Sequence, residues 1–141
     1  MLNIKNLTTT DINLTLLEEI ADRLTHREID LTICNNELIK KYNHQYRNIN
    51  RATDVLSFPI ESDFDNMPLG SIVISADFVE EKSKEFGHSS SDELTLLFIH
   101  GLLHLLGYDH EIDNGEMRKK EEEIITQFKL PKSLIVRVEE S

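Results

Sequence analysis

One segment, from Leu94 to Leu106, constrains the fold more than any other part of the sequence. Its residues, LTLLFIHGLLHLL, are apolar on nearly every face of a helix. The rest of the domain has to cover such a helix, so we predict that it lies buried at the centre of the fold. Ser90 and Glu93 together are typical of a capping box at its start, and Gly107 suits its C-terminal end. The segment is too short to span a bilayer.

Strand and helix patterns alternate along the rest of the chain. Short apolar or alternating runs predict strands at residues 3–7, 29–34, 53–58 and 70–74, with a loop at residues 61–69. Helical spacing of apolar residues after a capping residue predicts four further helices: from Thr10 or Asp11 to Leu24, from Asn35 or Asn36 to Tyr46, from Ser75 to Phe86, and from Gly115 to Phe128. The tail from Ser133 is assigned no element.

These elements predict a single α+β domain over residues 1–141. We expect a mixed, mostly parallel sheet of about four strands covered by about five helices, with the apolar helix of residues 94–106 in the centre. No Pro- or Gly-rich linker divides the chain, and Cys34 is expected to be buried as a small apolar side chain. Residues 1–6 lack the pattern of a secretory signal, so we expect a cytoplasmic protein without a membrane segment.

Three histidines have the spacing of a metal site, His100-x3-His104-x2-Gly107-x2-His110. Residues four apart on an α-helix differ by about 40° in direction and about 6 Å in height, so His100 and His104 can bind one ion. Gly107 can reverse the chain and return His110 to the same point. We therefore predict one divalent metal ion on these histidines, with an open position for water and an anionic oxygen. Three imidazoles suit zinc, but also nickel, copper or cobalt.

The spacing matches the metzincin protease pattern, His-Glu-x-x-His-x-x-Gly-x-x-His, except that Gly101 replaces the glutamate base. Peptide hydrolysis by that route is therefore disfavoured. Three neutral imidazoles leave the ion its full charge, which favours a phosphodiester substrate. Such an ion also lowers the pKa of a bound water molecule to about 7. The alternatives are histidines that only fill a core and a purely structural metal. Asp109 either orients a ligand or is an exposed acid after a turn.

The net charge of −11 disfavours nonspecific binding of nucleic acid, which draws its affinity from Lys and Arg. RNA binding by this chain therefore requires a local basic patch. Residues 37–51 supply a candidate that contains Lys40, Lys41, Arg47 and Arg51. Residues 109–123, by contrast, contain seven acids and three bases, so the charge is unevenly distributed along the chain.

Residues 100–110, HGLLHLLGYDH, resemble the signature of the YbeY family of endoribonucleases, and residues 53–59, TDVLSFP, resemble its second block. The similarity spans residues 28–128 and includes Asn43-x-x-Tyr46-Arg47 and Gly70-x-Ile72-x-Ile74-Ser75. It implies a single-strand-specific, metal-dependent endoribonuclease with zinc on His100, His104 and His110. It also implies 16S rRNA 3′-end maturation from an rRNA precursor and ribosome quality control, with the small ribosomal subunit and assembly factors as partners.

The resemblance adds Arg47 to the three histidines as a catalytic residue. It implies that Arg47 neutralises a phosphate beside the metal, whereas the alternative is a surface or ion-paired arginine. Members of the family often have Asp at the position of Ser71, so no function of that carboxylate is transferred. His88 is expected in an exposed loop. Weaker candidates for RNA contact are Lys40, Lys41, His44 and Arg51.

Two other functions remain open. One is hydrolysis of another bond, such as an amide, with the same ion, and Gly101 argues against the protease form of it. The other is a ribosome-assembly module in which the metal only stabilises the fold and residues 37–51 contact RNA. An open coordination position with exchangeable water would argue against that module.

Overall fold

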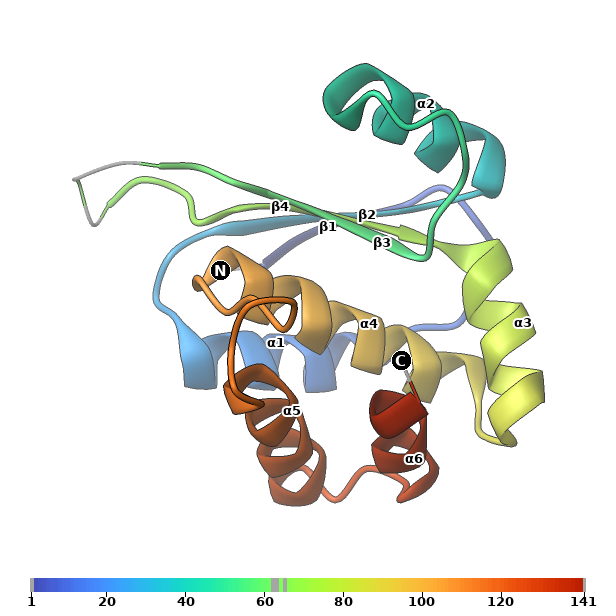
Figure 1. Cartoon of the computed structure of the whole chain (residues 1–141), viewed down its shortest axis with the longest axis vertical. Helices are drawn as coiled ribbons and strands as arrows, with labels where there is room; N and C mark the ends of the chain where they lie inside the picture. Colours follow the sequence, from blue (N-terminus) through green and yellow to red (C-terminus); the bar gives the residue numbers. More distant parts are fainter. Residues whose placement is uncertain (1, 62–63, 65, 141) are drawn as a thin grey trace.

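The computed structural model describes residues 2–61, 64 and 66–140, and within these ranges it contains one four-stranded sheet and six helices (Figure 1). The strand order is β1-β2-β4-β3, with β1, β2 and β4 parallel and β3 antiparallel to β4. The predicted α+β class with a mixed, mostly parallel sheet is confirmed. Part of the predicted loop, residues 62, 63 and 65, lies outside the described residues.

In chain order the elements are β1 (Leu2–Asn6), α1 (Leu14–Leu24), β2 (Ile29–Cys34), α2 (Asn36–Arg47), β3 (Val55–Pro59), β4 (Gly70–Ser75), α3 (Ala76–Phe86), α4 (Ser90–Leu105), α5 (Glu116–Gln127) and α6 (Ser133–Glu140).

Helix α4 lies at the centre of the domain, as its apolar sequence predicts. Figure 1 shows α2 on one face of the sheet and α4 on the other, with α5 and α6 on the far side of α4. α4 contacts β3, β4 and the helices α1, α3, α5 and α6. Every apolar residue from Leu94 to Leu105 is buried. Among the described residues, no helix is both long enough and apolar enough to cross a membrane.

Gly101 lies at a close approach of α4 to the sheet. A Cβ atom at this position would lie 2.9 Å from Ile72 Cγ2 and 3.2 Å from Ser57 Oγ. The Ser57 hydroxyl donates a hydrogen bond to the Gly101 carbonyl at 3.1 Å, which ties β3 directly to the helix. The small residue therefore allows the turn of α4 that carries the histidines to lie against β3 and β4.

The start of α4 differs from the prediction. Ser89, not Ser90, is the N-cap, since its hydroxyl accepts a hydrogen bond from the Asp92 N–H at 3.0 Å. Glu93 does not complete a capping box, because its side chain is fully buried and pairs with more distant residues. The Glu93 side chain could either bond to the backbone at the start of α4, as in a capping box, or pair with distant charged groups. In the structure it pairs with His88 and Arg137.

The side chain of His88 is buried, contrary to the prediction of an exposed loop histidine. Its side chain is 2% exposed, with Nε2 2.8 Å from Glu93 Oε1 and Nδ1 2.8 Å from Ser133 Oγ. Arg137 Nε lies 3.3 Å from Glu93 Oε2, an ion-pair distance without hydrogen-bond alignment. The buried Glu93 carboxylate thus has a histidine and an arginine as partners, which offset the cost of removing it from water.

Helix α1 begins later than predicted. Its N-cap is Asn13 rather than Thr10 or Asp11, and the Asn13 side chain accepts a hydrogen bond from the Leu16 N–H at 3.2 Å. The carbonyl of Thr10 instead accepts a hydrogen bond from the Asn6 side chain at 3.0 Å. That bond holds Thr10 in the loop that follows β1, before the helix starts.

The tail from Ser133 forms α6, a helix that the sequence analysis did not assign. Leu134 and Val138 are buried in a small cluster with Leu96 of α4 and Ile125 of α5. On the same helix, Arg137 NH2 lies 3.5 Å from Asp54 Oδ2 at the start of β3. α6 therefore joins the central helix to the strand at the sheet edge.

We predict that Gly101→Ala destabilises the fold, although alanine favours an α-helix over glycine by about 1 kcal/mol. Overpacking against Ile72 and Ser57 should lower the free energy of unfolding by about 1 to 3 kcal/mol in urea denaturation. Ile72→Ala makes room, so the double variant should lose less than the sum of the two single variants, by at least about 0.5 kcal/mol. Strictly additive losses would contradict this close contact.

Candidate metal centre

The three histidines converge at the C-terminal end of α4. His100 and His104 lie one helical turn apart, and their Nε2 atoms are 3.2 Å from each other. Gly107 has a φ of 100°, in the left-handed region, and the Tyr108 N–H bonds to the Leu103 carbonyl at 3.0 Å. This turn returns the chain so that one nitrogen from each of the three histidines, His110 included, lies within 4.8 Å of the others. The predicted convergence is confirmed.

The donor set fits a divalent ion. Two imidazole nitrogens that bind one ion tetrahedrally at about 2.0 Å are about 3.3 Å apart, close to the separation of the His100 and His104 Nε2 atoms. Burial, followed by the proximity of His100 and His110, lowers the pKa of His104. A lowered pKa keeps that imidazole neutral, which is the state that binds a metal. His104 can therefore bind an ion without first losing a proton.

Glu121 of α5 orients one of the histidines. Its carboxylate Oε1 lies 2.7 Å from His100 Nδ1, and its side chain is 5% exposed. A carboxylate partner at Nδ1 favours the tautomer that has its proton there, so the lone pair of Nε2 faces His104. Glu121 was not predicted from the sequence, where Asp109 was the candidate for this role. An available signal was that Glu121 shares the buried face of α5 with Met117 and Ile124.

Two acids shape the loop that carries His110. Asp109 Oδ1 accepts a hydrogen bond from the Glu111 N–H at 3.0 Å, which forms a tight turn around the histidine. Asp113 accepts hydrogen bonds from the Met117 N–H at 2.9 Å and the Gly115 N–H at 2.8 Å. These two bonds lower the pKa of Asp113, so its carboxylate stays charged at the N-terminus of α5. Asp109 therefore contacts the loop backbone next to His110.

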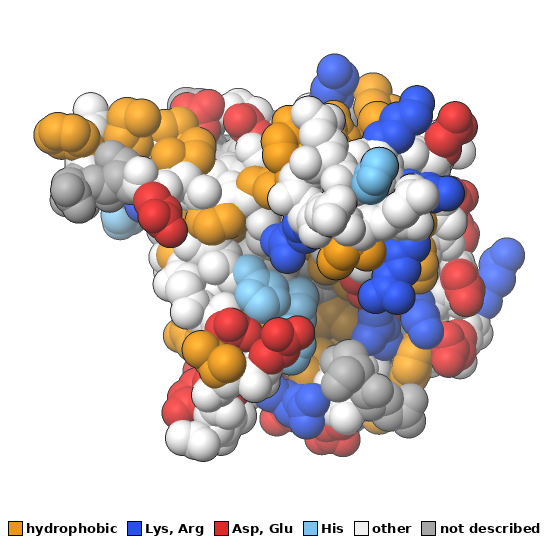
Figure 2. Space-filling view, turned by 45° about the horizontal axis from the view of Figure 1, so that its top comes forward, with side chains coloured by type: hydrophobic (Ala, Val, Ile, Leu, Met, Phe, Trp, Pro, Cys, Tyr) orange, Lys and Arg blue, Asp and Glu red, His pale blue; other side chains and the backbone are white. Residues whose placement is uncertain are grey.

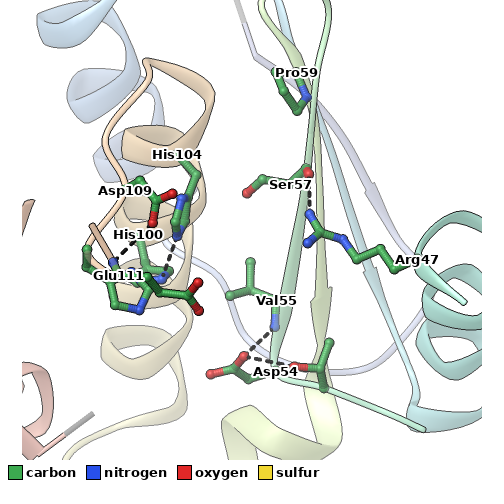
Figure 3. A pocket seen from close by; sticks show the side chains of 11 residues that line it. Arg47, Asp54, Val55, Ser57, Pro59, His100, His104, Asp109 and Glu111 are labelled. Carbon is green, nitrogen blue, oxygen red and sulfur yellow. Dashed lines mark hydrogen bonds between the residues drawn. The ribbon is translucent and has the colours of Figure 1, made fainter. Parts of the chain in front are cut away.

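Arg47 lies across the cavity from the histidines, although it comes from α2 on the opposite face of the sheet (Figure 3). Its NH2 group donates a hydrogen bond to the Ser57 carbonyl at 3.0 Å, and its guanidinium lies 5.9 Å from the centre of the Phe58 ring. The cavity has a volume of about 480 Å³. Its lining consists of Arg47, Thr53, Asp54, Val55, Ser57, Pro59, His100, His104, Asp109, His110 and Glu111.

Acidic and basic side chains lie on different sides of this cavity. Figure 2 shows the histidine side chains between acidic side chains on one flank and a basic side chain on the other. Of the basic candidates from the sequence, Arg47 alone is among the described lining residues. Ser71 lies in β4, outside the lining. The residues that the structure does not bring into the cavity are Lys40, Lys41, His44 and Arg51.

The sequence is similar to a family of proteins and to individual relatives that share one name. The family described as endoribonuclease YbeY matches residues 2–129. A protein named endoribonuclease YbeY from Aliarcobacter butzleri is 59% identical over 138 residues, which cover 97% of this chain and 99% of that protein. The protein of the same name from Campylobacter jejuni is 52% identical over 121 residues, or 86% of this chain and 90% of the relative.

A solved structure supports the same fold. The solution structure of a protein from Thermotoga maritima is 29% identical in sequence and superposes with a TM-score of 0.62. The match covers 91% of this chain and 89% of the other. An experimentally determined structure therefore has a similar overall fold.

We predict that each chain binds one divalent ion at the three histidines, because their nitrogens already converge. Elemental analysis of untagged protein measures this stoichiometry. Less than about 0.2 equivalents of metal, with none regained after zinc is added, would contradict a site of this type.

Glu121→Gln should weaken zinc binding by about 10- to 100-fold, because the amide supports the His100 ring less strongly than a carboxylate does. Competition with a chromogenic chelator gives the two dissociation constants. Glu122→Gln, at the next position of α5, is the matched control and should bind zinc as the unmodified chain does. Equal affinity in the two variants would remove Glu121 from the site.

Proposed function

Because this chain belongs to the endoribonuclease YbeY family, we propose that it cleaves single-stranded RNA in the cavity lined by His100, His104 and His110. The proposed substrate is the rRNA precursor, in 16S rRNA 3′-end maturation and in ribosome quality control. The proposed setting is the cytoplasm, with the small ribosomal subunit and assembly factors as partners. The family resemblance supports these biological details, and the cavity supports the chemistry.

One arrangement carries the proposal: three histidines and one arginine line the same cavity. Figure 3 shows His100 and His104 on one side of β3 and Arg47 on the other. The histidines would hold the ion, with zinc the best match to three imidazole donors. When bound, such an ion polarises a phosphoryl oxygen and makes hydroxide available from water near neutral pH. The nearby acids Asp109 and Glu111 also favour a cation at this position.

Arg47 supplies the positive charge on the other side of the cavity. One of its N–H groups is bound to the Ser57 carbonyl, and the aromatic ring of Phe58 lies beside the guanidinium. These contacts hold the guanidinium at the cavity wall, and its remaining N–H groups can bind the oxygens of a phosphate. We assign Arg47 the role of binding and neutralising the scissile phosphate.

Gly101 argues against an amide substrate. In the related protease pattern a glutamate at this position acts as the base. Here a side chain at residue 101 would collide with the side chains of Ile72 and Ser57, so a glutamate is poorly accommodated at this position. A phosphodiester, whose charge suits both the ion and Arg47, is therefore the better substrate. An assembly module with a structural metal would not require a cavity of about 480 Å³ beside the histidines.

We predict that Arg47→Ala lowers cleavage of single-stranded RNA by about 100-fold, because one charged donor to the phosphate is lost. The free energy of unfolding should change by less than about 1 kcal/mol, since Arg47 is exposed. Arg47→Lys should restore activity in part, because lysine retains the positive charge but cannot form bidentate hydrogen bonds with a phosphate. Cleavage is measured at fixed salt under single-turnover conditions.

Lys40→Ala is the matched control for this experiment. Lys40 is an exposed cation on the same helix, α2, and it does not line the described cavity. Its loss should leave cleavage within about twofold of the unmodified chain, because it changes only the general charge of the surface. Equal cleavage by the Arg47→Ala and Lys40→Ala proteins would show that Arg47 does not bind the scissile phosphate.

A further inference from the structure

The outer edge of β3 forms one wall of the cavity. β3 is the last strand in the sheet order, so one of its sides has no strand partner. The Ser75 N–H bonds to the Asp54 carbonyl at 2.9 Å, and the Ile60 N–H bonds to the Leu69 carbonyl at 3.0 Å. Backbone groups of an antiparallel strand alternate in direction, so the even-numbered residues from 54 to 60 face β4. Val55, Ser57 and Pro59 therefore face outward, and all three line the cavity.

Two of the outward backbone groups near the site already have side-chain partners. The Val55 N–H donates to the side chain of Asp54 at 2.8 Å, and the Ser57 carbonyl accepts from Arg47 at 3.0 Å. Pro59 has no N–H to donate. The Ser57 N–H is the remaining outward donor of these three residues, and no acceptor is found for it among the described residues. This pattern gives the edge a single free N–H donor in the stretch that faces the histidines.

The position of this N–H is set by two contacts. N–H and C=O of one strand residue point in the same direction, so Arg47, which binds the Ser57 carbonyl, also lies beside the Ser57 N–H. The Ser57 hydroxyl bonds to the Gly101 carbonyl at 3.1 Å, and Gly101 follows His100 on α4. Ser57 is therefore held both to the arginine and to the helix that carries the histidines.

We propose that the Ser57 N–H and the Arg47 guanidinium together bind the two non-bridging oxygens of one RNA phosphate. The inference rests on the proposed function and assigns a further binding group to that site. A neutral backbone donor beside a fixed cation is a common way to bind an anion. The RNA backbone then runs along the edge of β3, with the bound phosphate between Ser57 and the histidines.

The same edge is poorly suited to an added peptide strand. β-strand addition needs donors and acceptors that alternate along the edge. Here the Val55 donor and the Ser57 acceptor are both occupied by side chains, and Pro59 removes a donor. A single phosphate needs only the donor that remains. The edge therefore favours an anion over a peptide.

Proton–nitrogen NMR of the zinc-loaded chain, titrated with dimethyl phosphate, tests the contact directly. The Ser57 amide proton should shift downfield as it donates to the phosphate. Leu56 is the internal control, because its N–H faces β4. A Ser57 shift no larger than that of Leu56, at dimethyl phosphate concentrations that move the Arg47 Nε–H resonance, would overturn the inference.

A pair of variants isolates the N–H in RNA cleavage. Ser57→Ala removes the hydroxyl and keeps the N–H, whereas Ser57→Pro removes both, and proline is compatible with an outward position of an edge strand. Ser57→Pro should cleave single-stranded RNA at least about tenfold more slowly than Ser57→Ala, as expected for a lost bond to a charged group. Equal rates in the two folded variants would contradict the inference.

The outcomes separate this inference from the proposed function. If the unmodified chain cleaves RNA and the Ser57 amide does not respond to dimethyl phosphate, the inference is wrong and the proposed function stands. If the amide responds but the zinc-loaded chain cleaves no RNA, the phosphate contact stands and the proposed nuclease is wrong. Should Ser57→Pro fail to fold, the titration of the unmodified chain still decides.

Discussion

The close packing of α4 against β3 and β4 at Gly101 is the contact on which the candidate site depends. It places the helix turn of His100 and His104 beside the edge strand, with the Ser57–Gly101 hydrogen bond at the junction. Because the sheet is only one strand wide beyond β4, Arg47 can reach around β3 from the opposite face. A larger side chain at residue 101 would collide with Ile72 and Ser57 at this junction.

Buried carboxylates connect this contact to the rest of the domain. Glu121 supports His100 from α5, and Glu93 joins His88 to Arg137 of α6. A buried carboxylate without a partner would destabilise the fold. Each of these acids therefore stabilises the packing of the element that carries its partner. α6 is thus more than a C-terminal extension, since Arg137 also pairs with Asp54, which lines the cavity.

The features that follow from local spacing could be predicted from the sequence. The burial of α4, the left-handed turn at Gly107 and the convergence of His110 on the other two histidines all depend on residues a few positions apart. The contacts that were missed join distant residues: Glu121 is 21 positions from His100, and Ser133 is 45 positions from His88. A short-range pattern carries no information about such partners. For Glu93 it even favoured a competing local bond.

The central claim is that the three histidines hold the ion that cleaves RNA in this cavity. It is tested most directly by removing the metal from the chain and adding zinc back in small steps while single-turnover cleavage of a single-stranded RNA is measured. The account predicts no cleavage without metal and a linear rise that ends at one equivalent of zinc per chain. Cleavage that persists in metal-free protein, or that does not change as zinc fills the histidines, would contradict it.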